Sequence, residues 1–404
     1  MAAGIITAIG IVFFAWQKNK YRIVKETLAN AIAKKTNSLY TIWYDSIHFD
    51  EISGMAYMKN IHISPDTAVI NRMKPGDLPY VLLDIRIASL DVSGVRTGKA
   101  LLGKQMIGNA VVIENADVII YFVKPVQKHT KITTEVNVIY NEILGNLKRI
   151  QVGSVFINNV NIKAMGYYTK EKDFDVTNGY IQLIDVIVDS SHSLDTTRTL
   201  FCKQAAMEVA SFISYNNNRP EIRVNRTIFS GKDKSLFFGS IYVNRFEDKN
   251  GDSSRLLYAR NLSLKGLNTN AIVNNKNITV GAITSKQIIL YQPPPEYFKS
   301  KNNAKPKRPD SSGFRHVYSI DMKHLSFPKI EFIPKANSGY TIGNIAIKIN
   351  EVKADEILKV QNSPVDYSKE VELSCDEISI DSKDSFYNYN FQNTSLNSLN
   401  KQLN

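Results

Sequence analysis

One short pattern of alternating apolar residues recurs along this chain of 404 residues. Its clearest copy, IQVGSVFINNVNI at residues 150–162, has apolar residues at every second position of two runs separated by Asn158-Asn159. A second copy begins with ITVGAI at residue 278, and looser copies cover residues 107–120 and 342–349. Alternation with a period of two predicts half-buried strands, and the Asn pair predicts a turn between them. Repeated units of this kind suggest a stacked or elongated sheet whose copies share one continuous apolar surface.

The composition is that of a folded protein, with 43% hydrophobic and 22% charged residues. The formal net charge is +12, and the basic residues are scattered apart from a cluster at residues 299–308. Diffuse positive charge favours anionic partners such as phospholipid headgroups, or serves solubility alone. No basic stripe interleaved with aromatic residues is present, so nucleic acid is not an expected partner.

The N-terminal stretch is uncharged over residues 2–16 and, apart from Thr7, apolar. It is shorter than the roughly 20 residues that span a bilayer. A membrane anchor over residues 1–20 is nevertheless predicted, with a signal peptide and a buried helix as alternatives. The basic residues between Lys18 and Lys25 would hold this flank in the cytoplasm by the positive-inside rule. The predicted anchor positions are Ile5, Ile6, Ile9, Ile11, Val12, Phe13, Phe14 and Trp16.

Apolar spacing divides the rest of the chain into strands and a few helices. Helical spacing predicts helices over residues 21–35, over 136–147 and from Asp195 or Thr196 to about Ser214. Strands are expected at residues 39–49, 55–63, 81–92 (as a pair), 101–122, 174–188, 222–243, 256–264 and through much of 317–375.

No catalytic or metal-binding motif stands out. The six His residues lack the spacing of metal ligands, and Cys202 and Cys375 lie far apart in unlike contexts. Glu114 and Asp117 flank an expected turn, where a structural role is preferred to an acid–base pair. The sequence therefore predicts no enzyme, no cofactor and no metal site.

Some strands are apolar at consecutive positions, as in VIIYFV at residues 118–123 and IILY at 288–291. A sheet with one solvated face would alternate strictly. Two explanations remain open at this point. The sheet is covered on both faces, or it is curved and its apolar interior is open to lipid chains.

The order of these segments resembles the AsmA-like family. The similarity begins at the apolar N-terminus, passes through residues 21–35 and reaches the strands around 47–63, where MKNIHIS at 58–64 is similar to the family's opening. LLYARNLSL at 256–264 and the Val-Gly units resemble its repeats. The resemblance implies a single anchor in the inner membrane of a Gram-negative bacterium, a body in the periplasm, and an apolar β-groove related to that of bridge-like lipid transfer proteins. This topology conflicts with the basic flank, and the resemblance is preferred.

The expected architecture is mainly β with a few helices, an elongated, strongly curved, repeat-built antiparallel sheet (a β-groove) behind an N-terminal helix. The expected division is an anchor (1–20), the helix and groove (21–298), a basic linker or loop after three prolines (299–313), a further β unit (314–380) and a polar flexible tail (381–404).

The expected function is to bind the acyl chains of phospholipid or another lipid and to assist lipid transport or outer-envelope maintenance, with the membrane and envelope proteins as further partners. The alternative is a structural or scaffolding envelope protein whose sheet is fully packed. The residues predicted to line the groove are Val111, Ile113, Val118, Ile120, Val155, Ile157, Val160, Ile162, Ile283, Ile288 and Leu290.

Overall fold

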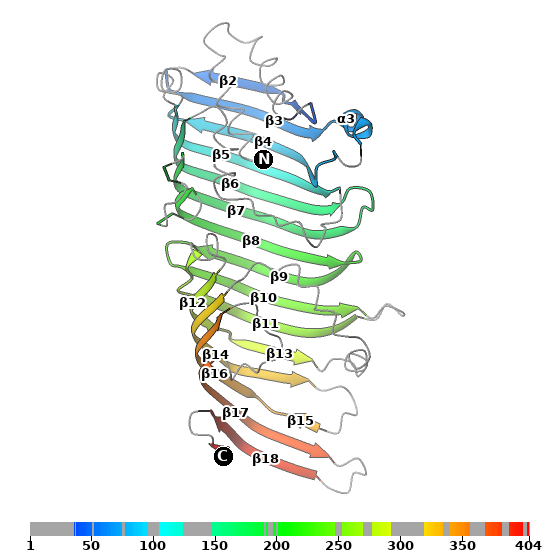
Figure 1. Ribbon diagram of the computed structural model, residues 1–404, viewed down its shortest axis with the longest axis vertical. Coiled ribbons are helices and arrows are strands. Elements are labelled where there is room, and N and C mark those ends of the chain that lie inside the picture. The colour runs from blue at the N-terminus through cyan, green and yellow to red at the C-terminus, as the bar shows by residue number, and fades with distance from the viewer. Residues whose placement is uncertain are drawn as a thin grey trace. The chain divides into compact units, whose positions relative to one another are not determined.

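The computed structural model describes residues 36, 38–50, 52–74, 77–95, 105–123, 148–189, 191–192, 197–198, 201–246, 253–269, 277–291, 319–333, 340–355, 368–381, 388–398 and 402–403. These residues form a mainly β protein, in which the strands belong to one mixed, largely antiparallel sheet (Figure 1). The chain divides into two compact units. Unit 1 comprises residues 1–211 and 216–218, and unit 2 comprises residues 212–215 and 219–404.

Unit 1 is built on long neighbouring strands. Strands β1 and β2 both pair with β3, antiparallel pairing continues through β4 to β5, β5 and β6 are parallel, and β7 returns antiparallel to β6. Strand β8 follows, and the one helix among the described residues, α3 (Thr67–Arg72), connects β3 to β4. The strands are β1 (Tyr40–Trp43), β2 (Ser46–Asp50), β3 (Met55–Pro65), β4 (Val81–Ser93), β5 (Gln105–Phe122), β6 (Arg149–Gly166), β7 (Lys172–Asp189) and β8 (Cys202–Asn216).

Unit 2 repeats this arrangement with shorter strands. Pairing runs antiparallel from β9 through β10 to β11, and β11 then pairs with both β12 and β13. These two lie parallel to β14, and antiparallel pairing continues through β16 and β17 to β18, with β15 also on β17 and β19 on β18. The strands are β9 (Arg219–Ser230), β10 (Ser235–Phe246), β11 (Ser253–Lys265), β12 (Asn277–Thr284), β13 (Gln287–Tyr291), β14 (Ser319–Ile333), β15 (Tyr340–Ile342), β16 (Ile345–Asp355), β17 (Ser368–Asp381), β18 (Asn388–Asn397) and β19 (Gln402–Leu403).

A row of positions with left-handed backbone, referred to below as bulges, crosses the strands of unit 1. Asn60, Asn115 and Asn159 have left-handed backbone, with φ of 48°, 52° and 53°. The bulge shifts the alternation, so the buried residues Met58 and Ile61 of β3 are three positions apart instead of two. Both Asn60 and Asn115 lie opposite the same gap in the register of β4, between Ile87 and Ser89. Across this line the pairing of β3, β4, β5 and β6 keeps one residue opposite one, so these strands share the irregularity, and only the pairing of β6 with β7 shifts its register there.

Unit 2 carries a similar row. Arg226 and Asn261, with φ of 53° and 52°, lie on either side of Gly239 at a gap in both registers. Strand β18 has Asn393 at a φ of 53° opposite a matching gap on β17. Rows of aligned left-handed residues are therefore a feature that strands of both units share.

These bulges correct three sequence-based interpretations. Asn158-Asn159 is not a turn but part of the continuous strand β6. Residues 81–92 were expected to form two strands but belong to one strand, β4. The shift in its apolar alternation resembles the break between two strands. The single strand expected at 39–49 is instead divided into β1 and β2, which meet opposite Asn60.

The repeated Val-Gly unit has a backbone explanation. A Cβ atom on Gly153 would lie 2.7 Å from the backbone oxygen of Asn109, and one on Gly281 would lie 3.1 Å from that of Lys265. At Gly343 the nearest atom would be the backbone nitrogen of Glu377, at 3.1 Å. The recurring glycine thus permits close approach of a neighbouring strand.

Other expectations also need correction. The helix predicted from Asp195 or Thr196 to Ser214 is wrong, because residues 202–216 form strand β8. The sheet was expected to be antiparallel but is mixed, because β5 is parallel to β6, and β12 and β13 are parallel to β14. Strand β18 lies within the expected flexible tail, and helix α3, capped by Asp66, was not predicted. The strands expected at 55–63, 174–188, 222–243 and 256–264 are confirmed.

Several predicted segments lie outside the described residues. They are the anchor over residues 1–20, the helices at 21–35 and 136–147 and the basic linker at 299–313. Within the part of the chain that the structure describes, no helix has the length and apolar character needed to cross a membrane.

Candidate functional site

The predicted groove residues of unit 1 share one face of the sheet. Register places Val111 beside Val155, Ile113 beside Ile157, and Val118 beside Ile162 on the parallel strands β5 and β6. Residues paired directly across strands point to the same side. On β4 their antiparallel partners are Val92, Leu90 and Ile85, which are all buried. Ile120 is partly buried and lies between Leu83 and Ala164 in the register, and Val160 is buried just past the bulge.

This apolar face of unit 1 is largely covered. Val111, Val155 and Val160 are only 4%, 7% and 6% exposed. They belong to a continuous apolar cluster that also contains Met58, Leu90 and Ile150. The partly buried Ile113, Val118, Ile157 and Ile162 pack against this cluster.

The other three predicted residues lie in unit 2. Ile288 sits between Ala259 and Ile330, and Leu290 sits between Leu257 and Phe332 on the same two neighbouring strands. Ile283 lies in a separate row, between Leu264 and Leu325. The two predicted sets therefore belong to different compact units, and each forms part of an apolar face there.

The apolar rows of unit 2 extend well beyond the predicted residues. One row runs across seven strands, β9 to β11, β13, β14, β16 and β17, and consists of Val224, Ile241, Ala259, Ile288, Ile330, Ile345 and Cys375. Five of these residues, Val224, Ala259, Ile288, Ile330 and Cys375, are buried. Ala259, Ile288 and Ile330 form a cluster, against which Leu257, Leu290 and Phe327 pack while partly exposed. The buried cluster on this face of unit 2 is thus smaller than that of unit 1.

A hollow of about 460 Å³ lies over four neighbouring strands of unit 2. Its lining includes the apolar row Phe327, Ile347, Leu373 and Leu396, which register places side by side. Sequence reasoning missed these residues, although three of the four stand in strands with alternating apolar positions.

The opposite face of unit 2 is polar and aromatic. Lys348 pairs with Glu372 at 3.0 Å, and Gln287 Nε2 donates to Glu331 at 3.0 Å. The rings of Tyr242 and Tyr258 lie 4.9 Å apart on this face. The sheet of unit 2 therefore has one apolar and one water-compatible face.

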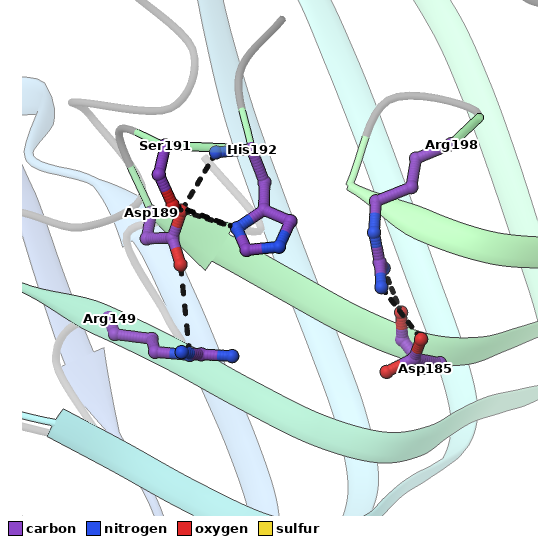
Figure 2. A network of polar contacts seen from close by, with 6 residues as sticks. All are labelled: Arg149, Asp185, Asp189, Ser191, His192 and Arg198. Carbon is purple, nitrogen blue, oxygen red and sulfur yellow. Dashed lines mark hydrogen bonds and ion pairs between the residues drawn. The ribbon is translucent and has the colours of Figure 1, made fainter. Parts of the chain in front are cut away.

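A second group of polar side chains gathers at the end of β7 (Figure 2). The Asp189 carboxylate is 6% exposed and accepts hydrogen bonds from Ser191 Oγ at 2.7 Å and from the His192 backbone nitrogen at 2.9 Å. Arg149 Nε lies 3.7 Å from its other oxygen. Burial raises the pKa of Asp189, but the hydrogen bonds from His192 and Ser191 outweigh it and lower the pKa below its usual value.

The geometry of Asp189, Ser191 and His192 does not form a catalytic relay. Asp189 Oδ1 lies 2.7 Å and Ser191 Oγ 3.1 Å from the same imidazole nitrogen, Nδ1 of His192. A relay needs the acid and the nucleophile on different ring nitrogens. Nearby, Arg198 donates to the backbone oxygen and the carboxylate of Asp185 at 2.6 and 2.7 Å. The hydrogen bonds to Asp189 hold Ser191 and His192 against the end of β7. The sequence Asp-Ser-Ser-His at residues 189–192 is typical of a turn and could have indicated this arrangement.

The remaining chemistry of the described residues is limited. None of their His, Cys, Asp and Glu side chains gather in groups of three or more that could hold a metal ion. Cys202 and Cys375 are buried and form no disulfide, and burial raises the pKa of the Cys202 thiol to about 11, which keeps it protonated and unreactive. In comparisons with known proteins, no protein-family model and no curated protein matches this chain.

Proposed function

We propose that this protein binds the acyl chains of phospholipid or another lipid along the apolar face of its sheet. In keeping with the resemblance to the AsmA-like family, it would assist lipid transport or outer-envelope maintenance as a non-enzymatic protein. Residues 1–20 would anchor it in the inner membrane, the body would lie in the periplasm, and the sheet would form an elongated, strongly curved groove. The observation that carries the proposal is the set of partly exposed apolar rows across the strands of unit 2.

Physical reasoning connects these rows to lipid. Leu257, Leu290 and Phe327 remain partly exposed around a buried centre of three residues. Contiguous exposed apolar surface is uncommon in soluble proteins and marks interaction sites. An acyl chain suits such a surface, because its burial contributes about 25 cal/mol per Å² and needs no directional contacts. The polar opposite face keeps this sheet compatible with water.

The scaffold alternative is supported by unit 1. There the predicted lining residues Val111, Val155 and Val160 are almost completely buried. A face that is already packed offers no surface to a ligand. We therefore assign the lipid-binding role to the open apolar face of unit 2 and a structural role to the packed face of unit 1.

Two adjacent phenylalanines of β10 provide a direct test. Phe238 pairs with Leu262 and lies on the apolar face, whereas Phe237 pairs with Ser263 and lies on the opposite face. A photoreactive benzophenone side chain would replace each in turn in the full-length protein, expressed in bacterial cells and irradiated there. Mass spectrometry of the β10 peptide should detect a lipid adduct at position 238 and little or none at 237.

The matched pair makes the outcome decisive. The two positions share the strand, the residue type and partial burial, so they differ chiefly in the face that they present. Equal lipid labelling at both positions would indicate non-specific membrane contact. Labelling at neither position, in protein that keeps its thermal transition, would contradict lipid binding by unit 2 and support the scaffold alternative.

A further inference from the structure

Among the described residues, strand β18 has one edge that is unpaired along most of its length. It pairs with β17 on one side from Asn388 to Asn397. On its other side, β19 pairs only with Leu396 and Asn397, and the described residues place no other strand there. Backbone donors and acceptors along such an edge are a ready template for another strand.

The side chains of β18 also lack a cover. Tyr389 and Phe391 are 55% and 52% exposed, whereas Cys375, in the apolar row of the neighbouring strand, is 4% exposed. Register places Phe391 beside Ile378 and Leu396 beside Leu373, so β18 continues the apolar face of unit 2. Tyr389 and Phe391 at this edge are therefore far more exposed than Cys375 on the neighbouring strand.

The sequence of β18, NYNFQNTSLN, contains no charged residue and no proline. Proteins commonly block exposed edge strands with lysine, proline or inward-pointing charges. The bulge at Asn393 is shared with interior strands, which accept neighbours on both sides. The composition of β18 is thus that of a strand designed to be paired.

We infer that the β18 edge over residues 388–395 accepts an added strand from a partner protein. The pairing of β19 with the other end of the same edge provides the precedent, because Leu403 lies beside Leu396 and extends its row. The partner strand would be extended, with apolar residues beside Tyr389 and Phe391 and with Asn or Gly near Asn393, where the bulge requires a left-handed residue. The partner would thereby extend the sheet of unit 2.

A second copy of this chain fits the edge poorly. Around Asn393, Gln392 pairs with Glu377 on the polar face and Thr394 pairs with Cys375 on the apolar face. Two-fold antiparallel pairing centred on Asn393 would set Gln392 of one copy against Thr394 of the other and mix the two faces. Pairing centred on Phe391 matches only residues 390–392 before Asn393 meets Tyr389. These mismatches favour a strand of different sequence.

The test uses a strand whose pairing with β18 is known. A fluorescein-labelled peptide carrying residues 370–381 of β17, with Cys375→Ser, would be titrated with the full-length protein and followed by fluorescence anisotropy. Saturable binding is expected. Phe391→Lys should weaken it about tenfold or more, because a charge on the apolar side of an edge opposes strand addition. Gln392→Lys, on the polar face, is the matched control and should weaken binding much less.

Several outcomes would overturn the inference. They are the absence of saturable binding, equal binding of a scrambled peptide, and equal affinity for the wild-type and Phe391→Lys proteins. Tyr389→Lys replaces Phe391→Lys if that variant loses its thermal transition. Sedimentation of the wild-type and Phe391→Lys proteins tests whether a second copy of the chain pairs with the β18 edge. Wild-type dimers that Phe391→Lys converts to monomers would show that it does.

Discussion

Some asparagines of this protein adopt left-handed backbone and also form side-chain hydrogen bonds. Asn159 adopts a left-handed conformation within β6, and its Nδ2 donates to Asn115 Oδ1 on the parallel strand at 2.6 Å. Next to it, Asn161 Nδ2 donates to Asp117 at 2.9 Å. Asparagine tolerates left-handed backbone better than other residues with a side chain. The Asn-rich strands therefore reflect the bulge row.

The sequence could not distinguish this bulge from a turn. Both need a residue with positive φ, and Asn-Asn between two apolar runs satisfies either. A turn and a bulge differ in whether the chain reverses direction after Asn159. This direction depends on the pairing of β6 with strands from other parts of the sequence. The residues of the bulge were thus recognisable at Asn158-Asn159, but their geometry was not.

Substitution at Asn159 separates the backbone role from the side-chain role. Asn159→Ala and Asn159→Gly both remove the hydrogen bond to Asn115, but only alanine places a Cβ atom in left-handed backbone. Asn159→Ala should therefore be about 1–2 kcal/mol less stable than Asn159→Gly. Urea denaturation of both variants measures the difference, and an alanine variant as stable as the glycine variant would show that the bulge is not required.

At the scale of the elements, the sequence predicted strands better than it predicted their arrangement. Alternation located most strands, but the helical spacing of Met207, Ala210 and Ile213 led to the wrong element at β8. Hydrogen bonding within a sheet overrides such weak preferences. Parallel pairing of β5 with β6 was also missed, although the long connection across residues 123–148 is what a parallel crossover needs.

The recurring glycine tests how tightly these strands approach one another. A Cβ atom at Gly153 would meet the backbone oxygen of Asn109 at 2.7 Å, whereas one at Gly108 would meet that of Ser93 at 3.4 Å. The first contact requires a strand to shift, and the second is nearly ordinary. We expect Gly153→Ala to cost roughly 2 kcal/mol or more in unfolding free energy and Gly108→Ala less than about 1 kcal/mol.

Thermal and urea denaturation of both glycine variants provide the measurement. The two glycines lie on adjacent strands within copies of the same sequence unit, so propensity effects should be similar. Equal destabilisation would mean that the strands adjust to a Cβ atom, and that the repeated glycine has another cause.

At the scale of the whole molecule, the two units differ in how well they cover their apolar faces. Unit 1 has one large buried cluster that includes Leu82, Ile150 and Val155. The buried cluster around Ile288 in unit 2 contains three residues. Both units show the same alternation in sequence, so the difference could not be predicted. Alternation shows which residues share a face, while the cover of that face depends on segments that pack there.

Hydrogen exchange should detect this difference in the full-length protein. Amides in strands exchange through local opening, and opening is harder where more apolar surface is buried. In delipidated protein, β4, β5 and β6 should exchange more slowly than β10, β11 and β14. Added phospholipid at about 100 times its dissociation constant should slow exchange in the unit 2 strands about a hundredfold, because a ligand stabilises the state that binds it. Mass spectrometry of peptic peptides resolves each strand. Slowing confined to β4–β6 would place the lipid on unit 1, and uniform exchange in both units would show that the apolar face of unit 2 is as firmly packed as that of unit 1.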